Sequence, residues 1–180
     1  RVIRLRRNFG QTAAMAAGFD HARGRVLVTI DGDLQNDPRD IPTLLGKIEE
    51  GFDVVCGRRI RREDRLLSRR IPSYLANRLI SLACGTRIRD NGCTIRAYRP
   101  EAVRGIPLYS EMHRLLPAIV ALSGSRIAEV EVRHHPRRFG RSKYGLSRIY
   151  GVVLDLLLLP LLLTFPSRPL PPGWRATICA

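Results

Sequence analysis

Two carboxylates stand close together directly after an apolar run of this chain. Asp31 and Asp33 flank a single glycine in the stretch VTIDGDLQNDP, residues 28–38. Mg²⁺ and Mn²⁺ commonly bind one or two protein carboxylates and complete their coordination with water and phosphate oxygens. Gln35 continues the alternation and offers a carbonyl oxygen, so these three residues are the candidate metal ligands. An ordinary turn remains the alternative, because Asp and Gly dominate turns.

Arginine is concentrated in one segment of a strongly basic chain. Residues 58–70 hold seven arginines, and the 180 residues carry 31 Lys and Arg against 16 Asp and Glu, a formal net charge of +15. This balance predicts an anionic partner, either nucleic acid, a phosphate-bearing substrate or an acidic membrane surface. Arg binds phosphate through two parallel hydrogen bonds. A metal site beside such a segment favours a diphosphate or phosphoester substrate, while a solvated face or a nucleic-acid patch remains the alternative.

Histidine and cysteine give weaker signals. His134 and His135 are adjacent, and neighbouring side chains of a strand point to opposite faces, so they would not easily share one metal ion. Cys93 is expected to be a packed thiol, because no His/Asn constellation accompanies it. The four cysteines show neither CxxC spacing nor a metal-ligand pattern, which favours a reducing compartment.

The elements that must position these residues alternate between strand and helix. Apolar runs predict strands at 2–5, 25–30 and 53–57, with helices at 12–23 and 39–50 between them. This β-α-β-α-β order predicts an α/β fold with a parallel sheet. Ligands of such sheets bind at the carboxyl ends of the strands, which is where the two aspartates fall.

The expected helix ends rest on familiar residues. Thr12 is suited to cap the first helix, and Gly24 to end it. Asp37 is suited to cap the second helix, with Pro38 at its first position and Gly51 closing it.

The second half of the chain predicts further elements and an apolar segment. We expect a helix at 72–84, a strand at 93–99, a helix at 111–122, a half-exposed strand at 127–132 and a basic loop at 134–145. Residues 149–165 are 17 residues with few polar members, at the short limit for a membrane span. An interfacial helix, a shortened membrane anchor and a buried core helix all remain open for this segment.

Four motifs in this order carry a resemblance to a known family. They are RNFGQTAAMAAGFDHARGRVLVTIDGDLQNDP, RDNGCTIRAYR, LYSEMHRLLPAIV and HHPRRFGRSKYGLSR. Together they resemble the family 2 glycosyltransferases of the dolichol-phosphate mannosyltransferase type, including bacterial polyprenyl-phosphate glycosyltransferases. The resemblance implies a GT-A (Rossmann-like) fold with a mostly parallel sheet. It also implies a nucleotide-sugar donor (GDP-mannose or UDP-hexose), a dolichyl or undecaprenyl phosphate acceptor, a Mg²⁺ or Mn²⁺ cofactor and a place at the cytoplasmic face of a membrane, with no nucleic-acid partner.

The resemblance also assigns expected roles to single residues. Asp31 and Asp33 match the positions that bind the metal and the donor diphosphate, with Gln35 alongside. Asp90 and Glu111 match acidic active-site positions, and we expect them to orient sugar hydroxyls or arginines rather than to abstract a proton. The expected ligands of the acceptor phosphate are Arg58, Arg70, Ser73, Arg138, Ser142 and Lys143.

The resemblance divides the chain into a catalytic domain at 1–148 and a hydrophobic membrane-proximal segment with its tail at 149–180. Family members begin with a strand and a P-x-Y-N-E-like segment that would precede Arg1, and the tail departs from the family pattern. We therefore expect an N-terminally truncated domain and weak or absent activity of these 180 residues alone.

The expected reaction is an inverting, metal-dependent transfer of a hexosyl group. A phosphate monoester has a second pKa of about 6, so the acceptor oxygen is already anionic and needs no strong base. A soluble family 2 enzyme acting on a sugar hydroxyl is one alternative. A basic nucleic-acid-binding module is another, although aromatic residues are only 6% of the chain, few for stacking on bases.

Overall fold

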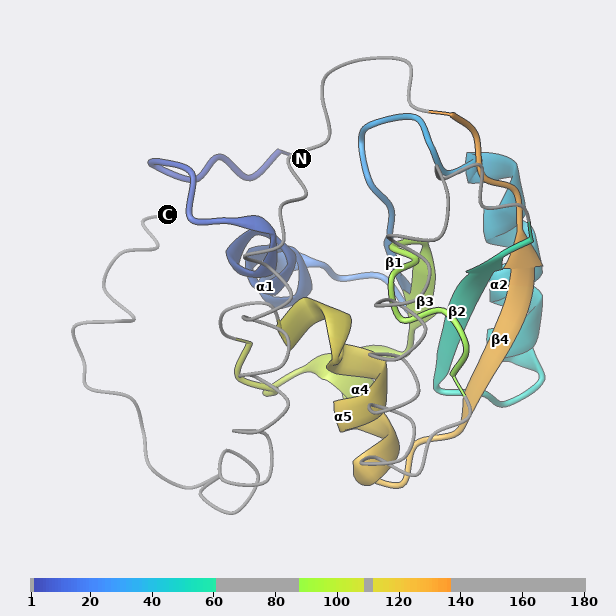
Figure 1. Cartoon of the computed structure of the whole chain (residues 1–180). Helices are drawn as coiled ribbons and strands as arrows, with labels where there is room; N and C mark the ends of the chain where they lie inside the picture. The colour runs from blue at the N-terminus through green and yellow to red at the C-terminus, as the bar shows by residue number, and fades with distance from the viewer. Residues whose placement is uncertain (1, 61–87, 109–111, 137–180) are drawn as a thin grey trace.

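The computed structural model describes residues 2–60, 88–108 and 112–136 (Figure 1). The predicted helix at 72–84, most of the basic loop and the apolar segment at 149–165 lie outside these ranges. The elements, in chain order, are α1 (Gln11–His21), β1 (Leu27–Thr29), η1 (Pro38–Asp40), α2 (Ile41–Glu49), β2 (Val54–Arg59), β3 (Arg96–Tyr98), α4 (Pro100–Val103), η2 (Met112–Arg114), α5 (Leu116–Leu122) and β4 (Ile127–Val132).

The strands form a mixed sheet with the order β1-β3-β2-β4. β3 runs antiparallel to both of its neighbours, and Ala97 lies between Val28 of β1 and Val55 of β2. Only β2 and β4 pair in parallel within the described part of the sheet. The expectation of a mostly parallel sheet is therefore wrong for this part, because a strand from far along the chain inserts between the two strands that the β-α-β pattern suggested were neighbours.

The strand expected at 2–5 is also absent from the described elements. Val2 is 92% exposed and Ile3 is exposed as well, and neither belongs to a strand. An apolar run forms a strand only where a neighbouring strand bonds its backbone N–H and C=O groups. The other strands are present, although 25–30 shortens to Leu27–Thr29 and 53–57 extends to Arg59.

The two N-terminal helices differ in how well their ends were predicted. α1 begins at Gln11 after Gly10 and ends before Ala22, so the expected cap by Thr12 and end at Gly24 are wrong. Thr12 is instead buried against the rest of the protein. For the second helix the predicted cap is present, although it lies on the 3₁₀ turn that precedes α2: the carboxylate of Asp37 accepts a hydrogen bond from the Arg39 backbone N–H at 2.9 Å.

Pro38 opens the 3₁₀ turn η1, which continues into α2. Gly51 follows the helix with φ of +96°, a left-handed conformation that costs glycine little. The helix expected at 111–122 is split into η2 and α5. Pro117 sits in the first turn of α5, where its missing N–H would have no helical partner in any case.

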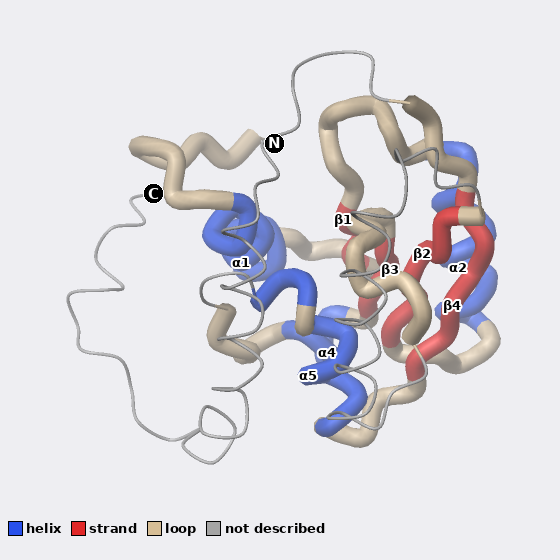
Figure 2. Tube along the Cα trace, viewed as in Figure 1, coloured by secondary structure: helices blue, strands red, loops and turns tan. Residues whose placement is uncertain are grey.

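Helices cover both faces of the sheet (Figures 1 and 2). On one face, Phe19 of α1 packs with Tyr98 and with Leu116 and Val120 of α5. The rings of Phe19 and Tyr98 meet edge to face, with centroids 5.4 Å apart. On the other face, Leu44 and Ile48 of α2 pack against the sheet. Each fully buried aliphatic or aromatic side chain contributes about 1.5–3 kcal/mol, so this packing fixes the strand ends that carry the site.

Successive residues of the central strands β2 and β3 pack in the cores on opposite faces of the sheet. Val54 belongs to the core beneath α1 and α5, whereas Val55 belongs to the core beneath α2. Tyr98 and Ala97 of β3 divide in the same way. Among the helices that the structure describes, none combines the length and the apolar character needed to cross a bilayer.

Candidate active site

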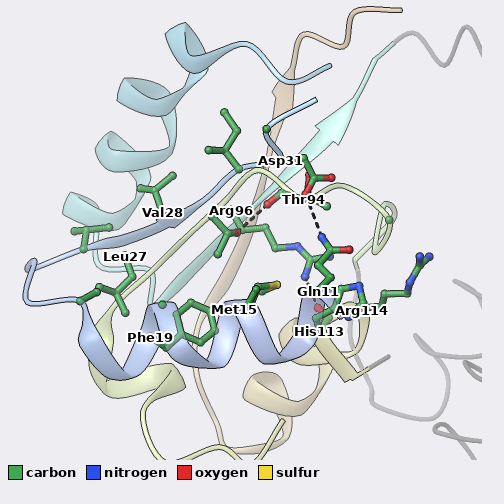
Figure 3. A pocket seen from close by; sticks show the side chains of 18 of the residues that line it. Gln11, Met15, Phe19, Leu27, Val28, Asp31, Thr94, Arg96, His113 and Arg114 are labelled. Carbon is green, nitrogen blue, oxygen red and sulfur yellow. Dashed lines mark hydrogen bonds between the residues drawn. The ribbon is translucent and has the colours of Figure 1, made fainter. Parts of the chain in front are cut away.

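The loop after β1 brings Asp31 to the wall of a cavity. This cavity has a volume of about 530 Å³ and is bounded by α1, β1 and the segments around 91–96 and 113–114. The Gln11 side-chain amide, from the first turn of α1, donates a hydrogen bond to the Asp31 carboxylate at 3.0 Å (Figure 3). The end of a strand and the start of a helix therefore meet at this carboxylate, as expected for a ligand site of an α/β fold.

The rest of the DGDLQ loop is shaped by local hydrogen bonds. Asp33 accepts a hydrogen bond from the Gln35 backbone N–H at 3.2 Å. Leu34 between them has φ of +63°, an uncommon conformation for a residue with a Cβ. The Gln35 carbonyl accepts from the His135 N–H at 2.8 Å, which ties the loop to the segment that follows β4.

The oxygen atoms of this loop fit a divalent cation that takes its other ligands from water and a substrate. Asp31 and Asp33 are both partly exposed. Among the described residues, no cluster of three or more His, Cys, Asp and Glu side chains is arranged to hold a metal. Mg²⁺ is often bound by only one or two carboxylates, with waters and substrate phosphates filling the other positions. The loop therefore suits a divalent cation that also binds substrate phosphates.

Asp90 is committed to an arginine. Its carboxylate receives the Arg59 guanidinium through two hydrogen bonds, Nε to Oδ2 at 2.8 Å and Nη2 to Oδ1 at 2.9 Å. The same carboxylate accepts from the Gly92 backbone N–H at 3.2 Å, and Asp90 is 3% exposed. Its main action in this structure is to hold Arg59 at the end of β2.

Of the other predicted site residues, only Arg58 lies in the described part of the chain. Arg58 lies at the end of β2 and forms an ion pair with Glu131 of β4. The remaining predicted site residues lie outside the described ranges: Arg70, Ser73, Glu111, Arg138, Ser142 and Lys143.

The cavity is also lined by residues that sequence reasoning missed. Arg96 of β3 is 3% exposed and donates to two backbone carbonyls, those of His113 at 3.0 Å and Asn91 at 2.5 Å. The His113 ring accepts or donates a buried hydrogen bond with Thr12 at 2.7 Å. One signal was available, because an arginine inside the strand-like run CTIRAY must bury a charge that needs partners.

The described thiols are buried, and the adjacent histidines lie beside the segment that carries Asn36 and Asp37. Cys56 and Cys93 are free and buried, and burial raises the pKa of both thiols, that of Cys56 to about 12. The expectation that Cys93 is a packed thiol is confirmed. His135 lies with its Nε2 atom 3.5 Å from the Asp37 carboxylate, and His134 pairs with Asn36 in an isolated β-bridge.

Comparison with known proteins decides the family. Residues 1–106 match the sequence profile of glycosyl transferase family 2. The chain belongs to glycosyl transferase family 2. The resemblance to the family 2 glycosyltransferases is thereby confirmed.

Two curated relatives are similar over most of the chain. The dodecaprenyl-phosphate galacturonate synthase of Rhizobium johnstonii is 48% identical over 172 residues, which are 94% of this chain and 51% of the relative. The undecaprenyl-phosphate 4-deoxy-4-formamido-L-arabinose transferase of Shewanella sediminis is 41% identical over 155 residues, which are 86% of this chain and 46% of the relative. The chain thus spans about half the length of these family 2 relatives.

A solved structure supports the GT-A fold. Glucosyl-3-phosphoglycerate synthase from Mycobacterium tuberculosis, crystallised with Mg²⁺ and uridine diphosphate, superposes with a TM-score of 0.58 at 20% identity. The match covers 87% of this chain and 56% of that enzyme. At 20% identity, this similarity supports the fold of the chain and nothing further.

Proposed function

We propose that the protein transfers a glycosyl group from a nucleotide sugar to a polyprenyl phosphate, with inversion at the anomeric carbon. The observation that carries the proposal is Asp31 at the end of β1, on the wall of a cavity of about 530 Å³. A carboxylate there suits the diphosphate of a donor through a divalent cation. Support for the acceptor comes from the two curated relatives, whose names both specify a polyprenyl phosphate.

Asp31 and Asp33 would hold a Mg²⁺ or Mn²⁺ ion, with Gln35 alongside. When bound, this ion would neutralise the donor diphosphate and favour departure of the nucleoside diphosphate. Gln11 supports the arrangement, because its hydrogen bond fixes one oxygen of Asp31. The presence of Mg²⁺ and uridine diphosphate in the M. tuberculosis enzyme is consistent with this assignment.

The acceptor phosphate is the nucleophile of the proposed reaction. Its oxygen is anionic at neutral pH, so the protein needs to bring two phosphate groups together rather than to remove a proton. Arginines serve this purpose best, because they bind phosphate oxygens in pairs. We assign this role to Arg58, Arg70, Ser73, Arg138, Ser142 and Lys143, of which only the first lies in the described part of the chain.

The two acidic residues would orient these groups. Asp90 already holds Arg59 with two hydrogen bonds, so its proposed role is to position an arginine at the end of β2. Glu111 would orient a sugar hydroxyl or an arginine. A polyprenyl phosphate is anchored in a bilayer, and the +15 charge of the chain favours an acidic membrane surface, which we propose to be the cytoplasmic one.

The test is a transfer assay with the full-length protein. Radiolabelled UDP-hexoses, UDP-hexuronates and GDP-mannose are offered with undecaprenyl phosphate in detergent, with Mg²⁺, with Mn²⁺ or with EDTA. We expect lipid-linked product with one donor, its loss in EDTA and a decrease of about 100-fold or more in Asp33→Ala. Asp20→Ala, on the exposed side of α1, is the matched control and should retain wild-type transfer. Product on a free sugar hydroxyl but not on the polyprenyl phosphate would contradict the proposed acceptor.

A further inference from the structure

Asn91 presents a buried side chain whose amide is unbonded. The residue is 3% exposed, and neither its Nδ2 nor its Oδ1 atom has a hydrogen-bond partner in the structure. Buried polar groups of native proteins are nearly always bonded, so an orphaned one needs an explanation. An amide offers both donors and an acceptor, and here all of them are unused.

A second buried asparagine, Asn36, differs from Asn91 because its side chain is hydrogen-bonded. Asn36 is 7% exposed, and its Nδ2 atom donates to the Thr94 hydroxyl at 2.9 Å. Asn36 therefore has a structural bond that explains its burial. Asn91 has no such bond, although it lies in the same region of the fold and both Asn91 and Thr94 line the cavity.

The backbone of Asn91 is firmly held. Its carbonyl accepts a hydrogen bond from the Arg96 guanidinium at 2.5 Å. The preceding residue, Asp90, is fixed by Arg59. An unbonded amide on a fixed backbone is preorganised, so a ligand that met it would lose little free energy in ordering the protein.

The cavity has one polar and one apolar end. The polar end is lined by Gln11, Asp31, Thr94, His113 and Arg114, and the apolar end is lined by Met15, Phe19, Leu27 and Val28 (Figure 3). Asn91 lines this cavity together with Asp31 and Arg96. Arg96 adds a buried positive charge to the wall, and its Nε atom also lacks a hydrogen-bond partner. An oxygen-rich ligand suits these unused donors and the acceptor.

We infer that the Asn91 amide binds hydroxyl groups of the sugar that the donor carries. The inference rests on the proposed function, because it takes the ligand of the cavity to be a nucleotide sugar. The sugar of such a donor is attached directly to the diphosphate, so it lies within reach of the wall that holds Asp31. A sugar hydroxyl both donates and accepts hydrogen bonds, and two neighbouring hydroxyls match the donor and acceptor of one amide. Asn91 then contributes to the choice of sugar.

The experiment compares binding of the whole donor with binding of its nucleotide part. The full-length protein and its Asn91→Leu variant are titrated calorimetrically in Mg²⁺ with the nucleotide sugar and with the corresponding nucleoside diphosphate. Leu has the same branched skeleton of side-chain heavy atoms as Asn and has no polar atoms. We expect Asn91→Leu to weaken binding of the nucleotide sugar by about 10- to 100-fold and binding of the nucleoside diphosphate by less than about 3-fold. Its melting temperature should be unchanged or higher, since an unbonded buried amide is removed.

Asn36→Leu is the matched control. It removes the bond to Thr94, so its melting temperature should fall, while the ratio of the two affinities stays at the wild-type value. If Asn91→Leu does not fold, the binding of deoxy-sugar donors is measured instead in the wild type and in Asn91→Ser. At least one deoxy donor should bind the wild type about 10-fold more weakly than the complete donor does, whereas Asn91→Ser should bind these two donors with equal affinity.

The outcomes separate this inference from the proposed function. Equal losses for nucleotide sugar and nucleoside diphosphate, or no loss for either, would overturn the role of Asn91 and leave the transfer reaction intact. Binding of nucleotide sugars without transfer to undecaprenyl phosphate would overturn the proposed acceptor, while the affinity ratio still decides the role of Asn91. Failure of the wild type to bind any nucleotide sugar would overturn both.

Discussion

Arg59 and Asp90 form a two-pronged ion pair between the end of β2 and the turn that leads to β3, with contacts of 2.8 and 2.9 Å. The Arg59 backbone N–H donates to the same carboxylate at 3.2 Å. Gly92 allows this approach, because a Cβ there would lie 3.0 Å from the Arg59 guanidinium. The pair thus connects the arginine-rich segment to the cavity wall that carries Asn91.

Removing one member of this pair should be costly. The Asp90 and Arg59 side chains are 4% and 15% exposed, so Asp90→Ala would remove a carboxylate that bonds a nearly buried guanidinium. We expect the free energy of unfolding to fall by about 3–5 kcal/mol, measured by urea denaturation. Replacing both residues, in Arg59→Met with Asp90→Leu, should cost less than the sum of the two single changes.

The control for this prediction is an exposed ion pair. Lys47 and Glu50 lie 2.7 Å apart at the end of α2, with side chains 38% and 54% exposed. Lys47→Ala should cost less than about 1 kcal/mol. Equal losses in Lys47→Ala and Asp90→Ala would contradict the structural role of Asp90.

The fold could be predicted where its determinants are local. Asp37 and Pro38 specify the start of a helix within three residues, and the structure has the predicted cap. The place of β3 could not be predicted, because Ala97 pairs with Val28 across about 70 residues of sequence, and apolar runs do not encode their partners. The run at 2–5 has strand-forming residues but no strand in the structure, for the same reason.

Divalent ions and a nucleoside diphosphate should stabilise the protein through Asp31. A ligand at 100 times its dissociation constant adds about 2.7 kcal/mol to the free energy of unfolding. We expect Mg²⁺ with uridine or guanosine diphosphate to raise the melting temperature of the wild type, and this shift to disappear in Asp31→Asn. Asp20→Asn, on the exposed part of α1, should keep the full shift. A wild-type shift retained in Asp31→Asn would argue against the metal–diphosphate role.

The pKa of Cys56 predicts a thiol that does not react in the native protein. Burial in β2 raises this pKa to about 12, so the thiolate fraction at pH 8 is only about 10⁻⁴. Iodoacetamide should therefore label Cys56 slowly at pH 8 and at an ordinary rate in urea, as measured by peptide mass spectrometry. Rapid labelling of the native protein would contradict its burial.

The same pKa has a consequence for stability. Because the folded state disfavours the thiolate, this stabilisation is complete below the pKa of the unfolded thiol and is lost as the pH rises from about 9 towards 12. The decrease in the free energy of unfolding between pH 9 and pH 11 should accordingly be smaller in Cys56→Ala than in the wild type.

The candidate site was predictable only in part. Asp31 and Asp33 could be found because both carboxylates follow one strand. Asn91 and His113 could not: Asn91 stands out because its buried amide has no hydrogen-bond partner, and His113 because it bonds to Thr12, 101 residues away. Residue type alone does not distinguish an orphaned buried amide from a bonded one, as Asn91 and Asn36 illustrate.

The hydrogen bond between Thr12 and His113 should matter for both stability and activity. It is buried and 2.7 Å long, and it ties α1 to η2 next to Gln11, which bonds Asp31. Thr12→Val keeps the shape but removes the hydroxyl, so the free energy of unfolding should fall by about 1–3 kcal/mol. Because Gln11 loses its fixed position, kcat/KM for the donor should also fall, by about 10-fold. Thr43→Val, at an exposed position of α2, should change stability by less than about 0.5 kcal/mol and leave activity unchanged. A loss of stability in Thr12→Val without a loss of kcat/KM would mean that α1 does not position the candidate site.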